Sequence, residues 1–303
     1  MSVPLAAMRR PTLLIVGCGD VGMRVLRLLA PRWRVYALTS TPARCAELRA
    51  AGAVPLLGDL DVPHTLGRLG GLADAVLHLA PPPSAGQEDT RTRHLLTALA
   101  RGGRVARLVY MSTSGVYGDC AGARFDETRP VHPATARGRR RVHAESLCRW
   151  FGQHSGACVA ILRVPGIYAS DRPGGHPRER LQRGTPVLVA ADDVYTNHIH
   201  ADDLAQACVA ALLRGAPQRT YHACDDSELQ MGDYFDLAAD LCHLPRPPRI
   251  TRTEAATQLS AMQLSFMSES RRLVNRRLTH ELRVVLHYPT VREGLGGDVS
   301  QMP

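Results

Sequence analysis

Three glycines stand close together near the start of the chain, directly after a short apolar run. In a strand-to-helix turn, a first glycine permits the tight turn, a second lets the backbone approach a pyrophosphate, and a third lets helix and strand pack closely. The helix that begins there offers free N–H groups and the positive end of its dipole to phosphate oxygens. The spacing predicts a dinucleotide-binding loop, with a glycine-rich turn that binds no ligand as the alternative. The loop residues are Gly17, Cys18, Gly19, Asp20, Val21 and Gly22.

The choice between NAD and NADP depends on the end of the next apolar run. An acidic residue at this place holds the ribose 2′-hydroxyl of NAD. This chain instead has Thr39 and Ser40 there, with Arg44 just beyond. Neutral hydroxyls and a guanidinium accommodate a 2′-phosphate that a carboxylate would repel, so the sequence favours NADP over NAD. A solvated helix residue is the alternative interpretation of Arg44.

Two later strand ends belong to the same predicted site, because parallel strands end at one edge of their sheet. Asp59 and Leu60 follow the third apolar run, and we expect them to meet the adenine. Leu79, Ala80 and Pro81 follow the fourth, and we expect them to pass beside the cofactor.

Apolar runs alternate with segments of helical spacing over the first half of the chain. Strands that are apolar on both faces and alternate with helices indicate a parallel sheet covered on both sides. We therefore expect an α/β protein of the Rossmann type with a doubly wound parallel sheet. The expected strands are 12–16, 34–39, 54–57, 75–79, 108–112 and 159–164, and the expected helices are 21–30, 43–51, 89–101, 137–154 and 201–213.

The pattern loosens after Val164, where segments rich in proline, glycine and charge follow one another. We expect a nucleotide-binding domain over residues 1–165, completed by about 194–214. The segments 166–193 and 215–303 would form a smaller substrate-binding domain. Their irregular pattern contrasts with the alternation that precedes them.

Composition restricts the chemistry further. The chain has 303 residues and a formal charge of +9, and all 37 of its basic residues are arginine. Without lysine there is no Schiff base, no lysine proton relay and no P-loop lysine. The arginines are spread along the chain rather than gathered, which favours pockets for small anionic molecules over nucleic-acid binding.

Membrane and metal partners are not expected. No apolar run approaches the ~18 residues that span a bilayer, and the first residues do not follow the order of a secretory signal. The eight cysteines form no C-x-x-C pair and no zinc-ligand spacing, so we expect no metal and reduced thiols in a cytoplasmic protein.

Several motifs occur in an order that is more specific than any one of them. They are the glycine loop, YMSTSGVYGD at 110–119, LRVPGIY at 162–168 and NHIHADDLA at 197–205. Together they resemble the extended short-chain dehydrogenase/reductases, in the NAD-dependent epimerase/dehydratase family, over about residues 12 to 295. The resemblance implies about seven parallel strands, a small α+β C-terminal substrate domain, a small-molecule substrate and a possible homodimer through the helix from Arg137.

The catalytic positions of that family are altered here. The family uses a Ser or Thr after the fifth strand, a Tyr that transfers a proton, and a Lys four residues later. Aligning on Glu145 places the Tyr position at Arg137 and the Lys position at Arg141, while the hydroxyl position is Thr113. Arg141 retains a positive charge for the cofactor ribose. Arg137 does not give up its proton near neutral pH, so it would bind an anion or polarise a carbonyl; Thr113 as an ordinary hydroxyl at a strand end is the alternative.

The same resemblance assigns roles to the remaining candidates. Tyr117 is a candidate for a displaced acid–base group, and so is Tyr168. We expect Tyr168, His198 and His200 on the substrate side, although the histidines have a structural alternative. Asp202 and Asp203 are expected to cap the following helix. Ser112, Arg141 and Pro165 are assigned to the cofactor.

Two functions follow from these observations. The first is an NAD(P)-dependent oxidoreductase or epimerase that acts on a small carbonyl or hydroxyl compound, anionic or linked to a nucleotide. The second is a non-catalytic NADP-binding sensor or scaffold that has lost the Tyr and Lys pair. The intact glycine loop supports both, because function depends on the site rather than on the fold.

Overall fold

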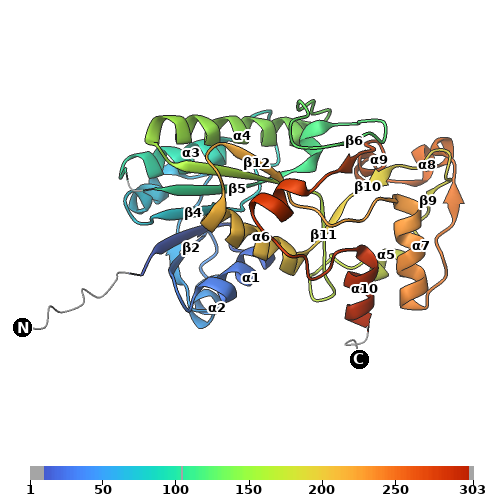
Figure 1. Ribbon diagram of the computed structural model, residues 1–303, viewed down its shortest axis with the longest axis horizontal. Coiled ribbons are helices and arrows are strands. Elements are labelled where there is room, and N and C mark those ends of the chain that lie inside the picture. Colours follow the sequence, from blue (N-terminus) through green and yellow to red (C-terminus); the bar gives the residue numbers. More distant parts are fainter. Residues whose placement is uncertain (1–9, 104, 300–303) are drawn as a thin grey trace, which may run out of the picture. The chain divides into compact units, whose positions relative to one another are not determined.

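The computed structural model describes residues 10–103 and 105–299. Its central sheet consists of β1 (Thr12–Val16), β2 (Arg34–Thr39), β3 (Val54–Leu57), β4 (Ala75–His78), β5 (Arg107–Thr113), β7 (Cys158–Val164) and β12 (Arg219–His222). The seven strands lie in the order β12-β7-β5-β4-β1-β2-β3 (Figure 1). β1 pairs in parallel with β2 and β4, β2 with β3, and β4 with β5. The predicted Rossmann-type sheet is confirmed, and its order reverses between β1 and β4, where such sheets bind ligands.

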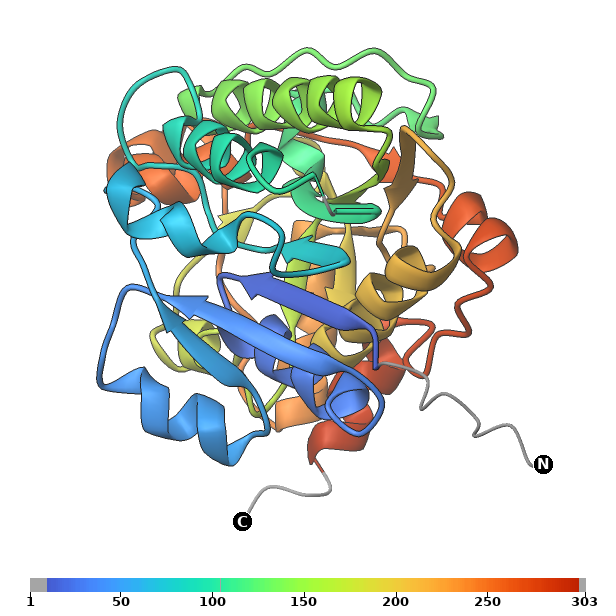
Figure 2. The ribbon, with the colours of Figure 1, turned by 90° about the vertical axis from the view of Figure 1, so that its left-hand side faces the viewer.

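The chain divides into two compact units. Unit 1 comprises the described residues up to 111, together with 143–161 and 211–219. Its helices are α1 (Asp20–Leu29), α2 (Arg44–Ala50), α3 (Thr90–Ala100) and a 3₁₀-helix at Pro63–Leu69. Figure 2 shows α1 and α2 on one side of the blue strands and α3 on the other. Leucine, valine and alanine fill this core, and Leu14, Val76 and Leu95 are fully buried.

Unit 2 comprises residues 112–142, 162–210 and the described residues from 220 onward. Short strands pair here in four separate two-stranded sheets. The pairs are β6 (Arg124–Phe125) with β15 (Arg272–Leu273), β8 (Gly166–Tyr168) with β11 (His198–His200), β9 (Val187–Leu188) with β14 (Arg249–Ile250), and β10 (Tyr195–Thr196) with β13 (Leu229–Gln230).

Short helices complete unit 2, and two longer helices have residues in both units. The short helices are α5 (Arg178–Gln182), α7 (Met231–Cys242), α8 (Arg252–Gln258), α9 (Ala261–Phe266), α10 (Val291–Val299), a 3₁₀-helix at Ser114–Tyr117 and a π-helix at Arg277–Glu281. The longer helices are α4 (Ala136–Ser155) and α6 (Ala201–Arg214). A core around Tyr234, Phe235 and Val291 holds α7 and α10 together.

The elements with strong periodicity lie where the sequence places them. The helices expected over 21–30 and 89–101 are observed at Asp20–Leu29 and Thr90–Ala100. The seventh strand of the sheet, β12, was not among the expected strands. Its four residues, Arg-Thr-Tyr-His, are too short and too polar for their pattern to indicate a strand. His198 and His200 do lie on one short strand, β11, which pairs with β8.

Asp203 has a different role from the predicted helix cap. Its side chain is fully buried, and its two carboxylate oxygens each accept a 2.9 Å hydrogen bond, one from the backbone N–H of His287 and one from that of Tyr288. The aspartate therefore fastens a loop that precedes α10 onto the first turn of α6. The sequence gives no sign of a partner 84 residues away.

Replacing Asp203 by alanine should lower the free energy of unfolding by about 2 kcal/mol, because two backbone N–H groups lose their acceptors. Urea denaturation followed by circular dichroism measures this loss. Asp202 is the matched control, since its side chain is 45% exposed, and Asp202→Ala should change the unfolding free energy by less than about 0.5 kcal/mol. Equal losses in the two variants would contradict the role assigned to Asp203.

Candidate functional site

The glycine loop is shaped by a close approach between two backbone segments of unit 1. Gly17 has a φ of +83°, and a methyl group there would lie 2.5 Å from the backbone nitrogen of Ala80. Both the backbone angle and the contact therefore require glycine. Val16 pairs with His78 in the sheet, so Gly17 and Ala80 leave adjacent strands at the same edge.

The loop leads into a helix end that no side chain caps. Gly19 precedes α1 without a side-chain cap, and a methyl group at Gly19 would meet no described atom within 4 Å. At Gly22, a methyl group would lie 3.3 Å from the carbonyl oxygen of Gly17 and 3.4 Å from Ile15. Gly19 therefore leaves open space in front of the first-turn N–H groups, and Gly22 allows α1 to pack tightly on β1. Open space before an uncapped helix N-terminus is what a diphosphate requires.

Arg44 lies beside this loop. Its Nη1 donates a 2.7 Å hydrogen bond to the carbonyl oxygen of Cys18, and its Nε lies 3.1 Å from the Glu47 carboxylate. The Cys18 side chain is buried, and burial raises the pKa of its thiol to about 11. Cys18 is therefore a packed, protonated side chain, while Arg44 brings a cation to the end of β2. The Thr39 hydroxyl accepts a hydrogen bond from the Thr41 backbone and shapes the same turn.

The residues after β3 and β4 are held by internal hydrogen bonds of unit 1. The Asp59 carboxylate accepts from the Asp61 backbone N–H at 2.9 Å, and Arg91 joins the Asp61 carboxylate to the Pro81 carbonyl oxygen. Leu60, Leu79 and Ala80 are buried. The two segments assigned to the cofactor are thus linked to each other through one arginine.

A buried network of hydrogen bonds fixes the end of β4. No sequence pattern indicated this network. His78 Nε2 lies 2.8 Å from the Thr92 hydroxyl, which donates to the Asp89 carboxylate at 2.8 Å. Asp89 also caps α3 by accepting from the Thr92 backbone N–H, and its own N–H donates to His143 Nδ1. All members except His143 are fully buried. The chain holds His78 in place, directly before the segment that touches Gly17.

Unit 2 contains a cavity of about 640 Å³, a size typical of small-molecule sites. Its wall includes Thr113, Arg137 and Arg141, together with Pro165 and Tyr168. Thr113 ends β5, and its hydroxyl accepts a 3.3 Å hydrogen bond from the Gly115 N–H. Arg137 and Arg141 project from the first turns of α4, one helical turn apart. The candidate catalytic residues Thr113, Arg137 and Arg141 therefore line one cavity.

Gly138 brings α4 close to the loop after β5. A methyl group at Gly138 would lie 2.9 Å from the Gly115 carbonyl oxygen, and the Gly138 N–H donates to the Thr135 hydroxyl at 3.0 Å. The absence of a side chain at this position lets the first turn of α4 pack against the backbone that follows Thr113. Arg137, its neighbour in sequence, is thereby brought to the same wall.

The wall of the cavity is positively charged. Two glutamates line it, and one of them, Glu269, forms a 2.7 Å ion pair with Arg271. The arginines of the wall are Arg137, Arg141, Arg180, Arg183 and Arg271. Five arginines against two glutamates leave a positive balance, which suits an anionic ligand.

The structure does not place Tyr117 at the cavity wall. Its side chain is 1% exposed. Arg163 Nη1 donates to its hydroxyl at 2.6 Å, and His222 Nε2 lies 2.6 Å from the same oxygen. Burial lowers the pKa of His222 to about 3, so the neutral ring donates from Nδ1 to the Val274 carbonyl oxygen and accepts from Tyr117 at Nε2. The Tyr117 hydroxyl is thus engaged in structural bonds.

Two other tyrosines that the sequence analysis did not single out line the cavity. Tyr195 is half-buried, with the Arg272 guanidinium 4.7 Å from its ring centroid. Tyr234 is buried, and burial raises the pKa of its hydroxyl above the ordinary value. No spacing rule pointed to them, because they come from β10 and α7, far from the motifs in sequence. Tyr168 also lies in the wall and is 1% exposed.

The candidate histidines lie together on β11, but only one belongs to the cavity wall as described. His198 is in that wall, whereas His200 packs its ring 3.9 Å from the centroid of Tyr288. Burial lowers the pKa of His198 to about 4. A buried, neutral His198 fits the predicted substrate side, and the contacts of His200 fit a structural role.

Ser112 is buried one residue before Thr113.

Comparisons with known proteins agree with this geometry. Residues 13–224 match the model of the NAD dependent epimerase/dehydratase family. The chain belongs to this family.

Relatives of the family cover most of the chain. GDP-6-deoxy-D-mannose reductase of Pseudomonas aeruginosa is 29% identical over 267 residues, which are 78% of this chain and 83% of that protein. A functionally unknown conserved protein from Silicibacter pomeroyi has a solved structure with a TM-score of 0.81 and 33% identity, covering 96% and 98% of the two chains. A dTDP-glucose 4,6-dehydratase from Streptomyces venezuelae, solved with NAD, shares the fold at a TM-score of 0.75 and 21% identity over 95% of each chain.

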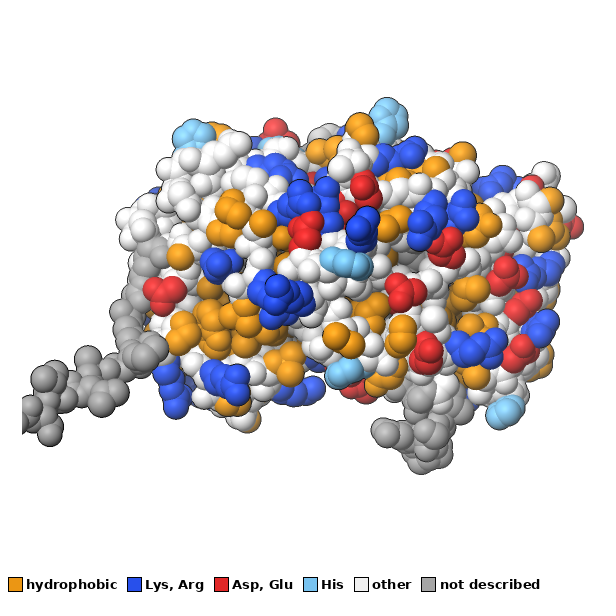
Figure 3. Space-filling model, viewed as in Figure 1, with side chains coloured by type: hydrophobic (Ala, Val, Ile, Leu, Met, Phe, Trp, Pro, Cys, Tyr) orange, Lys and Arg blue, Asp and Glu red, His pale blue; other side chains and the backbone are white. Residues whose placement is uncertain are grey.

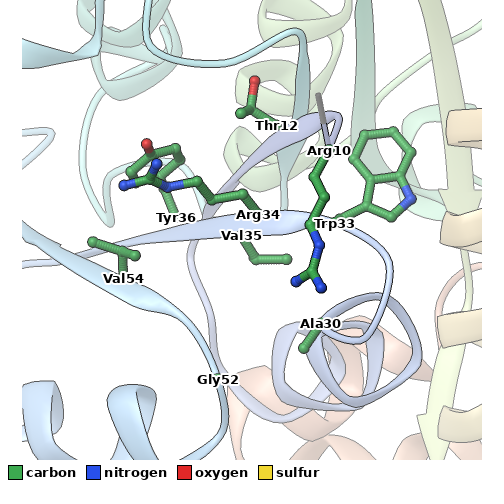
Figure 4. A pocket seen from close by; sticks show the side chains of 9 residues that line it. All are labelled: Arg10, Thr12, Ala30, Trp33, Arg34, Val35, Tyr36, Gly52 and Val54. Carbon is green, nitrogen blue, oxygen red and sulfur yellow. The ribbon is translucent and has the colours of Figure 1, made fainter. Parts of the chain in front are cut away.

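Unit 1 also contains a hollow, which lies at the amino-terminal ends of β1, β2 and β3 (Figure 4). It has a volume of about 360 Å³ and is lined by Arg10, Trp33, Arg34 and Tyr36, among others. The Arg34 guanidinium lies 5.4 Å from the Tyr36 ring centroid. Arg34 begins β2, whereas sheets of this family bind their ligands beyond the strands' carboxyl ends. This hollow therefore lies away from the strand ends at which the glycine loop is predicted to bind a cofactor.

Metal-binding clusters, membrane-spanning helices and disulfide bonds can each be considered for the described part of the chain. Among those residues no group of three or more His, Cys, Asp or Glu side chains is placed to hold a metal ion. No helix there is long and apolar enough to cross a membrane. The eight cysteines are all free. On the face drawn in Figure 3, blue and red side chains are interspersed.

The glycine loop yields a paired prediction. Gly17→Ala should lower the free energy of unfolding by about 3 kcal/mol, because the methyl group meets the Ala80 backbone and φ is positive. Gly19→Ala should change it by less than about 0.5 kcal/mol, since φ is −80° and the space is open. Gly19→Ala should nevertheless weaken NADPH binding by about tenfold or more, because its methyl group would stand where the diphosphate approaches.

Thermal unfolding and isothermal titration separate the two effects. Gly19→Ala that binds NADPH as tightly as the unaltered protein would show that this loop does not hold the phosphates. Gly17→Ala with unaltered stability would show that the contact with Ala80 does not constrain the loop.

Proposed function

We propose that this protein is an NADP(H)-dependent oxidoreductase or epimerase that acts on a small anionic carbonyl or hydroxyl compound, with nucleotide sugars as the substrate class. The observation that carries the proposal is the arginine-rich cavity, in which the Thr113 hydroxyl and the Arg137 guanidinium share one wall. The relatives support the substrate class, since two of them are named for GDP- and dTDP-linked sugars.

Each residue then has a definite part in the reaction. A bound nicotinamide nucleotide would supply the hydride chemistry, and Gly17, Gly19 and Gly22 would hold its diphosphate. Thr113 offers a hydroxyl that hydrogen-bonds the reacting oxygen of the substrate. Arg137 places a fixed cation where negative charge develops on that oxygen, which is an electrostatic contribution and not a proton transfer. Arg141 would hold the cofactor ribose by hydrogen bonds.

Proton transfer needs another group, because no guanidinium releases a proton near neutral pH. Tyr117 is not suited to this role, since its hydroxyl bonds to His222 and Arg163. Tyr195 is the best-placed phenol, because it lines the cavity and is half-buried, whereas Tyr168 and Tyr234 are buried.

The second candidate function is an NADP-binding sensor or scaffold without catalysis. It is favoured by the presence of Arg137 and Arg141 at the positions where the family has its Tyr and Lys. General acid–base help is worth about 10²–10⁴ in rate, so losing it without replacement would leave binding without useful turnover.

NADPH oxidation against a panel of carbonyl compounds and nucleotide sugars distinguishes the two functions. Turnover of any member supports the enzyme, and tight NADPH binding without turnover across the panel supports the sensor. For a turned-over substrate, Arg137→Ala should lower kcat by about 100-fold and leave the NADPH dissociation constant within about twofold of the original.

Arg139→Ala is the matched control for Arg137→Ala. Arg139 lies on α4 but is exposed and outside the described wall of the cavity, so its removal should leave kcat unchanged. Arg137→Lys should retain more activity than Arg137→Ala, because it keeps a positive charge. A normal kcat in Arg137→Ala would remove this residue from the mechanism.

The NADP preference gives a separate prediction. Arg44→Ala should weaken NADPH binding by about tenfold, because a charge-assisted bond to the 2′-phosphate is lost. NADH binding should change much less, because NADH has no 2′-phosphate. A large loss of NADH affinity would indicate that the loop is damaged by losing the hydrogen bond from Arg44 to Cys18. Arg49→Ala, an exposed arginine on α2, is the control. Equal weakening of both cofactors in Arg44→Ala would exclude a 2′-phosphate contact.

A further inference from the structure

His198 is a buried polar side chain whose surroundings leave one ring nitrogen unsatisfied. Its ring stacks on Tyr234 with a centroid distance of 4.2 Å and meets Tyr168 edge-on. The side chain is 9% exposed, and Nδ1 is buried with no hydrogen-bond partner among the described residues. A buried nitrogen without a partner costs stability, so its retention in a cavity wall calls for a functional explanation.

The protonation of the ring follows from its environment. Burial lowers the pKa of His198 to about 4, so the ring is neutral at physiological pH and carries one N–H. A buried N–H without an acceptor is rarer than a buried acceptor without a donor. We therefore assign the hydrogen to Nε2, which makes that nitrogen a neutral hydrogen-bond donor.

Gly166 keeps the edge of the ring that carries Nε2 uncovered. It pairs with His198 across β8 and β11, and it also lines the cavity. A methyl group at Gly166 would lie 3.3 Å from Cδ2 and 4.0 Å from Nε2 of His198. The glycine therefore leaves room for a ligand atom beside the donor.

A second polar atom without a partner stands nearby in the same wall. The Thr196 hydroxyl is buried with no hydrogen-bond partner among the described residues, and it lies two residues before His198. Arg180 belongs to the same wall, and its guanidinium lies 4.2 Å from the Phe235 ring centroid. Neutral hydrogen-bonding groups and a cation thus belong to the wall of the same cavity.

Matching donors and acceptors indicates the ligand. The Thr196 hydroxyl both donates and accepts, whereas His198 Nε2–H donates. A phosphate oxygen only accepts and already has arginines in this cavity to bind it. A hydroxyl group both donates and accepts, so it can satisfy Thr196 and His198 together.

We propose that His198 and Thr196 determine substrate specificity by hydrogen-bonding a hydroxyl group of the sugar, apart from the arginines that bind the anion. This assignment rests on the proposed function only in using the same cavity and substrate class. It requires no catalytic turnover.

Isothermal titration without cofactor tests the assignment. UDP-glucose, GDP-mannose and dTDP-glucose are titrated beside UDP, GDP and dTDP, and the tightest nucleotide sugar is compared with its own diphosphate. His198→Phe should weaken the nucleotide sugar by about tenfold and leave the diphosphate within about twofold. Its thermal midpoint should be unchanged or higher, because an unsatisfied nitrogen is removed. His64→Phe, at an exposed histidine of unit 1, should leave both affinities unaltered.

Two further variants test the same hydrogen bonds by other routes. Thr196→Val should weaken the nucleotide sugar without lowering the thermal midpoint, since the hydroxyl has no protein partner to lose. Gly166→Ala should weaken it by covering the Nε2 edge of a histidine that is still present. Weakening in all three variants, confined to the sugar-bearing ligand, supports the assignment.

Three results would overturn it. One is equal weakening of nucleotide sugar and diphosphate in His198→Phe, and another is a lower thermal midpoint with unaltered affinity, which marks a structural role. The third is that none of the six nucleotides binds the unaltered protein at millimolar concentration. Failure of NADPH turnover alone would reject the proposed enzyme while leaving these binding results standing.

Discussion

The close approach of Gly17 to the Ala80 backbone is the constraint on which the rest of the cofactor site depends. Because a methyl carbon at Gly17 would lie 2.5 Å from the Ala80 nitrogen, no side chain fits, and the turn must pass directly over the end of β4. That position sets the start of α1 and so the direction of its N–H groups. The buried chain from His78 through Thr92 to Asp89 holds the other side of the contact. Both segments are therefore fixed at the place where the predicted diphosphate would meet the helix dipole.

The electrostatics of this protein depends on the absence of lysine, since arginine is the side chain that supplies its permanent positive charges. A guanidinium stays charged when it is half-buried, and it offers donors in fixed directions but no acceptor. A cavity lined with arginines is therefore suited to anions over a wide pH range, but guanidinium groups alone cannot move protons. The chemistry of the site must accordingly be divided between fixed cations, which stabilise charge, and phenols or hydroxyls, which exchange protons.

Strong periodicity made the Rossmann sheet and its helices predictable, because each long element buries a whole face. The glycine loop was predictable for a similar reason, since three glycines at fixed spacing serve one local turn. The rest depended on long-range contacts. Asp203 resembles a helix cap locally, yet its partners are His287 and Tyr288. Tyr195 and Tyr234 enter the cavity from short elements whose pairing no local pattern specifies, and Tyr117 lies in a motif but bonds to His222.

Two of the buried histidines of unit 2, His198 and His222, show how similar burial leads to different roles. Burial keeps both His198 and His222 neutral, because it lowers both pKa values. At His222 each ring nitrogen faces a protein group, the Val274 carbonyl or the Tyr117 hydroxyl, so the ring contributes to stability. At His198 the chain supplies aromatic stacking but leaves Nδ1 without a partner. A fold that satisfies one buried imidazole completely could have satisfied the other, for instance by a donor facing Nδ1. Gly166 instead leaves the Nε2 edge of the ring uncovered, so the ring keeps an open donor, which is the arrangement expected of a residue that meets a ligand.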